Sequence, residues 1–285
     1  AVAVILQRFN PHASSPVAHE TSMNFRILLL LGSLSAFGPM AIDFYLPSFP
    51  TLALAFSTNV EHVQLTLSAY FIGLAGGQLL YGPLADRFGR RKPLLFGVLL
   101  FTVASVICSM ASSLEWLIAA RFLQALGGCA GIVISRAVVR DLCDPLASAK
   151  AFSQLMLVMG VAPILAPAIG GMLLTQFGWQ SIFICLALFG ALCGVAVALW
   201  LPETLPQDAP RSALPQAPSK YLEILKDRQF VIHALTGGLA IAGMFAYIAG
   251  SPHVLMQLHH IPPQHYGWIF GSNAFGLIAA SPLNA

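Results

Sequence analysis

Eight apolar stretches, each long enough to cross a lipid bilayer, dominate this sequence and limit what it can fold into. A helix needs about 20 mostly apolar residues to cross about 30 Å of hydrocarbon. Only 9% of the residues are charged, against about a quarter in soluble domains, so a soluble fold could not cover its surface with polar groups. The sequence therefore predicts an all-α integral membrane protein. The stretches lie at 26–47, 62–83, 93–112, 116–136, 150–175, 179–201, 229–251 and 265–285.

Lysine and arginine occur in alternate loops between the apolar stretches. The loops near 48–61, 113–115, 176–178 and 252–264 contain neither residue. Loops rich in these cations stay in the cytoplasm, so we expect the N-terminus and residues 202–228 on the cytoplasmic side of a bacterial inner membrane. The cations that define the pattern are Arg26, Arg87, Arg90, Arg91, Lys92, Arg136, Arg140, Lys150, Arg211, Lys220, Lys226 and Arg228.

One long polar segment separates the first six apolar stretches from the last two. Residues 77–85 and 276–284 match in the register of Gly, Pro and Leu, which indicates a duplicated protein with two six-helix halves. Met23 resembles a natural start, so residues 1–22 are expected to be disordered or non-native. The predicted domains are a six-helix half at 23–201, a cytoplasmic linker at 202–228 and the first two helices of an incomplete second half at 229–285.

Arg121 is the one cation that does not lie at a cytoplasmic edge of an apolar stretch or in the N-terminal tail. Ionisable groups within the membrane are costly and usually face a polar interior. At about 100° per residue, Arg121 shares a small, polar helix face with Gln124, Gly128 and Ser135. This face could line a cavity or meet another helix. The alternative is an arginine whose side chain reaches the outer interface.

Asp43 is the one carboxylate well inside an apolar stretch, and it shares a helix face with Gly32, Ala36 and Pro39. Burial favours the neutral form of a carboxylate. Asp43 is therefore a candidate carrier of a proton or partner of a cationic substrate group. The alternative is an interfacial residue that reaches water, or a helix cap near Pro47.

The fifth apolar stretch carries Gly160, Pro163, Pro167 and Gly171 on one narrow face. Two prolines in one helix remove backbone hydrogen bonds and bend it, and glycines let another helix approach closely. The pattern predicts a kinked packing helix, a hinge that seals against leakage, or both.

The loop after the second stretch reads Gly82-Pro83-Leu84-Ala85-Asp86-Arg87-Phe88-Gly89-Arg90-Arg91-Lys92. Its glycines permit a tight turn, and its carboxylate can cap a helix or pair with an arginine. The loop resembles the G-x-L-A-D-R-x-G-R-R-K signature of the major facilitator superfamily. That resemblance runs from about Met23 to Ala285 and implies a fold of twelve helices, of which about eight are present here. It also implies a conformational latch that stabilises the outward-facing state, formed by Gly82, Asp86, Arg87, Gly89 and Arg90.

Further motifs strengthen the resemblance. Arg121 and Gln124 are similar to the family's helix-4 motif R-x-x-Q-G, although the glycines here follow at 127 and 128. The fifth stretch resembles the antiporter motif G-P-x-x-G-G, which is associated with export, with Ala166 before Pro167, Gly170 and Gly171. Segments 41–47, 179–183 and 201–205 look like the Bcr/CflA group of drug:proton antiporters.

This resemblance implies a secondary active transporter that exports small drugs or metabolites in exchange for protons. Asp43, Arg121 and Gln124 would then serve proton coupling or substrate binding. An uptake symporter of the same fold and a non-transporting, truncated membrane remnant are the alternatives. The sequence contains no Walker loop and no nucleophile paired with a base, so we expect neither ATP-driven transport nor an enzyme.

The expected partners are a small-molecule substrate, protons and the lipid bilayer, and the complete protein is expected to be a monomer. No dense basic cluster suggests nucleic acid. Four histidines of one outer loop have no acidic residue or cysteine beside them, so we expect no metal, and no motif suggests another cofactor. They are His253, His259, His260 and His265.

Overall fold

The computed structural model describes residues 23–206 and 217–280, and all of the regular structure in these residues is helical. The predicted N-terminal extension, 1–22, lies outside this part of the chain, as do the last five residues of the eighth predicted stretch. Each of the eight apolar stretches forms helix in its described part, which confirms the all-α class. The long helices are α5 (Val60–Phe88), α6 (Arg91–Ser109), α7 (Leu114–Leu142), α8 (Pro145–Phe177), α9 (Gln180–Trp200), α11 (Arg228–Pro252) and α12 (Pro263–Ala280).

The number of spans is smaller than predicted in the part that the structure describes. Six helices are long and apolar enough to cross a membrane, or seven if the bent first pair counts as one span. The described part of α12 is not among them. Its polar residues, such as His265, Ser272 and Asn273, dilute the apolar character, and residues 281–285 fall outside the description.

The first predicted span is broken rather than continuous. It consists of α2 (Phe25–Ser35) and α3 (Phe37–Asp43), followed by η2 (Leu46–Ser48) and α4 (Phe49–Ala55), with a bend of 40° between α2 and the rest. Pro39 explains the break, because a proline ring clashes with the carbonyl four residues earlier, here that of Ser35. The expected outer loop at 48–61 thus contains a helix.

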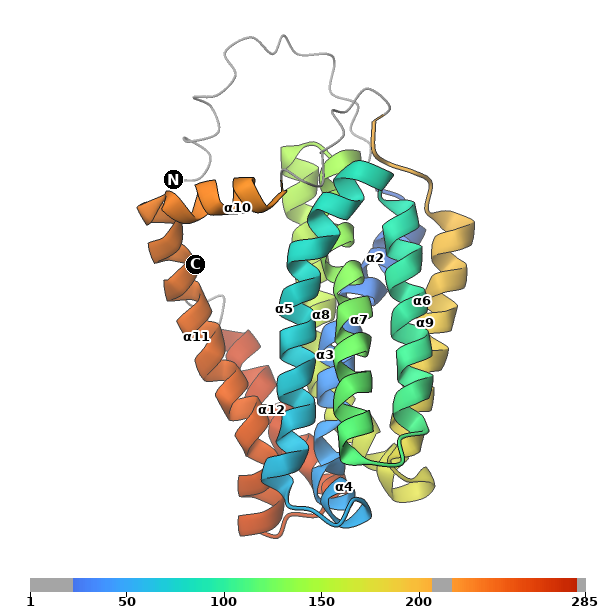
Figure 1. The fold of residues 1–285 in the computed structure, drawn as a ribbon, viewed down its shortest axis with the longest axis vertical. Helices are drawn as coiled ribbons and strands as arrows, with labels where there is room; N and C mark the ends of the chain where they lie inside the picture. The colour runs from blue at the N-terminus through green and yellow to red at the C-terminus, as the bar shows by residue number, and fades with distance from the viewer. Residues whose placement is uncertain (1–22, 207–216, 281–285) are drawn as a thin grey trace.

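A second expected loop is also helical. Residues 252–264 were expected to connect the last two stretches, yet a π-helix, η4 (His253–Leu258), directly continues α11. Such π-helical turns are rare and occur often at functional sites. In the linker, α10 (Ala217–Lys226) lies roughly at right angles to the long helices, between the start of α11 and the upper part of α5 (Figure 1).

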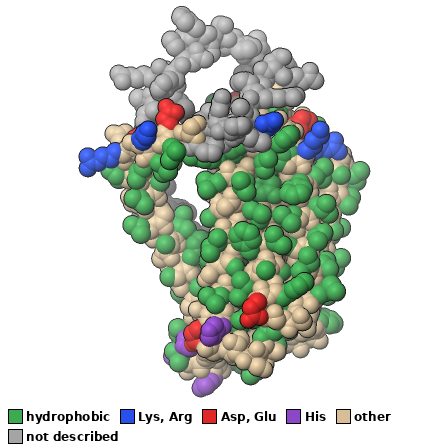
Figure 2. Space-filling model, viewed as in Figure 1, with side chains coloured by type: hydrophobic (Ala, Val, Ile, Leu, Met, Phe, Trp, Pro, Cys, Tyr) green, Lys and Arg blue, Asp and Glu red, His purple; other side chains and the backbone are tan. Residues whose placement is uncertain are grey.

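Helix α11 meets α5 at one end of the molecule and diverges from it toward α10 (Figure 1). At the meeting end, Gln64 donates a hydrogen bond to the Ala249 carbonyl over 3.2 Å, and the Phe71 and Phe245 rings lie 4.5 Å apart. On the face drawn in Figure 2, Lys and Arg gather at the α10 end and His at the opposite end, with hydrophobic side chains covering the flanks between them. The helices of 23–201 therefore contact α11 at the end away from the cations.

Candidate functional site

Arg121, in α7, is the largest side chain that is completely buried, at 0% exposure. Its guanidinium carbon lies 4.2 Å from the centre of the Tyr70 ring, 4.6 Å from that of Tyr45 and 5.9 Å from that of Phe183. Aromatic faces attract a cation electrostatically, and the attraction grows when water is excluded. The burial rules out the alternative in which Arg121 reaches the outer interface.

A chain of hydrogen bonds runs from Arg121 toward α6. Its Nη1 donates to Gln124 Oε1 over 2.6 Å, and Gln124 Nε2 donates to Ser105 Oγ over 2.7 Å. Arg121 Nε and Nη2, and the Tyr70 hydroxyl, are buried without a hydrogen-bond partner in the described part of the chain. Since buried donors are normally satisfied, this cluster has spare capacity for hydrogen bonds.

Asp43, at the end of α3, is 3% exposed. Within the described residues, its carboxylate forms no ion pair, and Arg121 is not its partner. The burial excludes a side chain that reaches interfacial water, and η2 just beyond it has no side-chain cap.

The glycine and proline face of α8 packs against both neighbouring helices. A Cβ on Gly170 would collide with the Phe44 carbonyl oxygen, directly after Asp43, and would lie 2.8 Å from the Phe44 carbonyl carbon. On α12, a Cβ on Gly267 would lie 2.5 Å from the Ala168 Cα. Near this face, α8 therefore forms a seam of close backbone contact with the end of α3, next to Asp43, and another with α12. Gly160 and Pro163 are half-buried, and Pro167 and Gly171 are buried; α8 continues as helix through both prolines.

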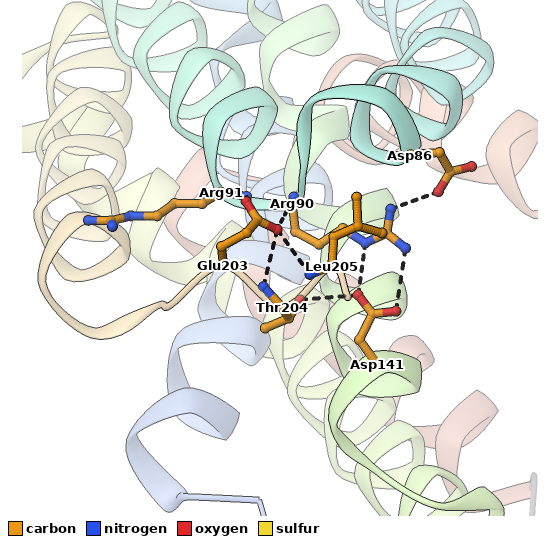
Figure 3. Close-up of polar contacts among 7 residues, drawn as sticks. All are labelled: Asp86, Arg90, Arg91, Asp141, Glu203, Thr204 and Leu205. Carbon is orange, nitrogen blue, oxygen red and sulfur yellow. Dashed lines mark hydrogen bonds and ion pairs between the residues drawn. The ribbon is translucent and has the colours of Figure 1, made fainter. Parts of the chain in front are cut away.

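The loop between α5 and α6 forms a second, charged cluster with residues at the end of α7 and just after α9 (Figure 3). Arg90 donates from Nη1 to Asp86 over 2.7 Å and from Nε to Asp141, at the end of α7, over 2.8 Å. The carboxylate of Glu203, just after α9, accepts from the backbone N–H of Arg90 over 2.7 Å. Burial opposes the charge of Glu203, but hydrogen bonds from four backbone N–H groups outweigh it and lower the pKa of this carboxyl.

Two residues assigned to the latch take little part in this cluster. Arg87 is exposed, with its guanidinium 5.5 Å from the centre of the Phe88 ring. Gly82 has only the Tyr221 hydroxyl nearby, 4.0 Å from where a Cβ would stand. Asp141 and Glu203 hold Arg90 instead, and neither residue was assigned to a site from the sequence. The sequence signal that could have identified them is a carboxylate near the end of a predicted membrane helix on the side where the cation-rich loops lie.

Replacing Arg121 by lysine should destabilise the protein by on the order of 2 kcal/mol, the strength of a desolvated cation–π contact. A lysine ammonium keeps the charge but cannot stack its plane on Tyr45 and Tyr70. Thermal unfolding in detergent measures the loss. The matched control is Arg136→Lys, an exposed arginine of the same helix, and equal stability of the two variants would contradict the assigned role of the aromatic contacts.

Comparison with known proteins places these features in a family. Residues 29–285 match the family model described as Major Facilitator Superfamily. The chain is 42% identical to an uncharacterised MFS-type transporter, YdgK, of Bacillus subtilis, over 90% of this chain and 64% of that protein. It is 31% identical to a bicyclomycin resistance protein homolog of Haemophilus influenzae, over 94% and 67%, and 35% identical to multidrug resistance protein D of Escherichia coli, over 80% and 57%. The chain thus spans 57–67% of the length of these relatives.

Solved structures share the fold at low identity. A bacterial homolog of the human lysosomal transporter Spinster, in an inward-facing and unoccupied conformation, superimposes with a TM-score of 0.71 at 19% identity, over 88% of this chain and 60% of that one. A D-xylose-proton symporter gives a TM-score of 0.59 at 15% identity, over 88% and 66%. At these identities the likeness concerns the fold alone.

Proposed function

Because the chain belongs to the Major Facilitator Superfamily, we propose that it forms the larger part of a secondary active transporter that exports small drugs or metabolites in exchange for protons. The chain is a multi-pass membrane protein with a partial major-facilitator fold. Relatives named for resistance to bicyclomycin or to multiple drugs support export. Members of this superfamily are generally transporters rather than enzymes.

The observation that carries the proposal is the placement of Asp43. Its carboxylate is buried, lacks an ion-pair partner in the described residues, and lies next to the seam between α3 and α8. An unpaired charge in a membrane interior is costly, and such a group is held more cheaply in its neutral form. Asp43 therefore carries a proton while this seam is closed and exchanges it when the seam opens.

Arg121 and Gln124 serve as the element that responds to Asp43. The two ionisable side chains are not in contact, and the guanidinium lies against the Tyr70 ring, 4.2 Å from its centre. Because charges interact over longer distances in an interior from which water is excluded, a change of charge on Asp43 would act on Arg121. The spare donors of Arg121 could also bind a polar substrate group.

The proposed setting is a bacterial inner membrane with the N-terminus and the linker in the cytoplasm, as the positive-inside rule indicates. The end at which α11 meets α5 then faces outward, and the cation-rich loop faces the cytoplasm. In that loop the proposed latch comprises Gly82, Asp86, Arg87, Gly89 and Arg90, with the ion pair of Asp86 and Arg90 as its main contact. Monomeric function of the complete protein is part of the proposal.

Everted membrane vesicles test the direction of transport. Respiration makes their lumen acidic, so a drug:proton antiporter should load a fluorescent cationic dye into them and release it when a protonophore is added. Dye that leaves the lumen together with protons would favour the uptake symporter, whose fold is equally compatible with this structure.

The mass of the expressed protein in its native membrane distinguishes a complete exporter from the remaining alternative, a truncated remnant that does not transport. Alternating access requires two halves that rock about a central site, and α11 and α12 are the only described helices beyond the linker. A product clearly heavier than the 30.3 kDa of these 285 residues supports a complete exporter. A product of this length with no dye accumulation would overturn the transport proposal.

A further inference from the structure

The residues that follow α9 are bound to the loop between α5 and α6 through one carboxylate (Figure 3). Glu203 accepts hydrogen bonds from the backbone N–H of Arg90 at 2.7 Å and of Arg91 at 3.2 Å. It also accepts from the N–H groups of Thr204 and Leu205, each at 3.1 Å. The carboxylate thus ties the beginning of the linker to the motif loop.

Glu203 supplies a helix cap that α6 does not have in its own sequence. Helix α6 starts at Arg91, and its N-cap residue, Arg90, makes no side-chain capping hydrogen bond. The first N–H groups of a helix need acceptors from outside it, and an anion is favoured at that positive end. A residue 112 positions further along the chain therefore caps this helix.

Gly89 leaves the room that this cap needs. Its φ of +87° is a conformation that other residues rarely adopt. A Cβ at this position would collide with one Glu203 carboxylate oxygen and lie 2.6 Å from Glu203 Cδ. The glycine of the loop motif thus accommodates both the turn and the linker carboxylate.

A second contact joins the linker to the ion pairs of the loop. Thr204 Oγ1 donates to Asp141 Oδ2 over 3.1 Å, and the same oxygen accepts from Arg90 Nε over 2.8 Å. Further along the linker, the Tyr221 hydroxyl donates to the Leu79 carbonyl of α5 over 2.8 Å. Both described parts of the linker are therefore attached to α5 or to the loop that follows it.

We infer that Glu203 is a positioning residue that makes the start of the linker part of the loop latch. By holding the backbone of Arg90, it directs the guanidinium to Asp86 and Asp141. Because the linker is the covalent connection to α11 and α12, these contacts attach the beginning of that connection to Arg90 and Asp141. This inference rests on the proposed latch role of the loop.

Thiol labelling of Cys143 tests the inference without any transport measurement. Cys143 is a free, half-buried cysteine two residues after Asp141, while Cys108, Cys129 and Cys193 are buried. In membranes containing the full 285-residue chain with Cys185→Ala, a charged maleimide reports how often this corner opens. Glu203→Ala should raise the labelling rate about fivefold, as expected when a helix cap is lost.

Two further variants distinguish loss of the Glu203 hydrogen bonds from a general loosening of the protein. Glu203→Gln should raise the rate less than Glu203→Ala does, because the amide oxygen still accepts hydrogen bonds. Glu223→Ala, an exposed glutamate of α10, is the control and should leave the rate unchanged.

A double variant tests whether Glu203 acts through Arg90. Arg90→Gln alone should raise the labelling rate, and adding Glu203→Ala should raise it little further. Additive effects of the two changes, or a wild-type rate in Glu203→Ala, would overturn the inference. Because these readouts do not involve a substrate, they can succeed even where dye export is absent, so failure here and failure of the proposed function are distinguishable.

Discussion

Asp43→Asn is expected to reduce proton-driven dye accumulation in everted vesicles to the level of vesicles without the protein. Asparagine has nearly the shape of a protonated aspartate, so the seam with α8 should still close and the protein should fold. It cannot release a proton, however, and the exchange cycle has no step that depends on the proton gradient. Dye accumulation before and after addition of a protonophore measures the effect.

The control for this variant is Asp144→Asn, which removes the same charge at the start of α8. Asp144 caps that helix by accepting from the Ala147 N–H, and asparagine is an equally good capping residue. This variant should transport normally. Undiminished proton-driven transport by Asp43→Asn would remove Asp43 from the coupling mechanism and leave only a packing role.

Gly170→Ala is expected to lower stability by about 3 kcal/mol, near the upper end of overpacking costs. The added methyl group would meet backbone atoms of Phe44 rather than a side chain that can rotate away. Helices α8 and α3 would have to separate where Asp43 lies. Thermal unfolding in detergent and the yield of folded protein measure the loss.

Gly76→Ala provides the matched control, because a Cβ at this position of α5 meets nothing within 4 Å. Alanine is favoured over glycine inside a helix by about 0.5–1 kcal/mol, so this variant should be at least as stable as the natural protein. A stability of Gly170→Ala equal to that of Gly76→Ala would mean that the seam between α3 and α8 is looser than the structure has it.

The helices themselves could be predicted because membrane folding is governed by local composition. Every backbone polar group in hydrocarbon needs an internal partner, so an apolar stretch of sufficient length becomes a helix. Helix ends were less predictable: α5 runs on to Phe88 and α7 to Leu142, past the predicted ends at 83 and 136. The break after Ser35 is explained by Pro39. From the sequence, Pro39 served only to define the helix face of Asp43, and the break was not predicted.

In the candidate site, likewise, contacts within one helix could be predicted and contacts between distant segments could not. Arg121 and Gln124 are three residues apart on one helix, so their contact follows from helical periodicity. The aromatic rings around Arg121 come from three other segments of the chain. Likewise, Arg90 and Asp86 are one turn apart, whereas Asp141 is 51 and Glu203 113 positions from Arg90.

The sequence by itself determined the membrane helices, their family and the side chains that are costly to bury, because each of these depends on neighbours within a few turns. The tertiary structure alone decided which of those side chains meet. Asp43 is buried with no ion-pair partner among the described residues, Arg121 is enclosed by rings, and Glu203 caps a helix that begins 112 positions before it. The physical reason is that these contacts follow from how helices pack across long separations in sequence. Close backbone approach at Gly170 and the space that Gly89 leaves for the Glu203 carboxylate set the distances.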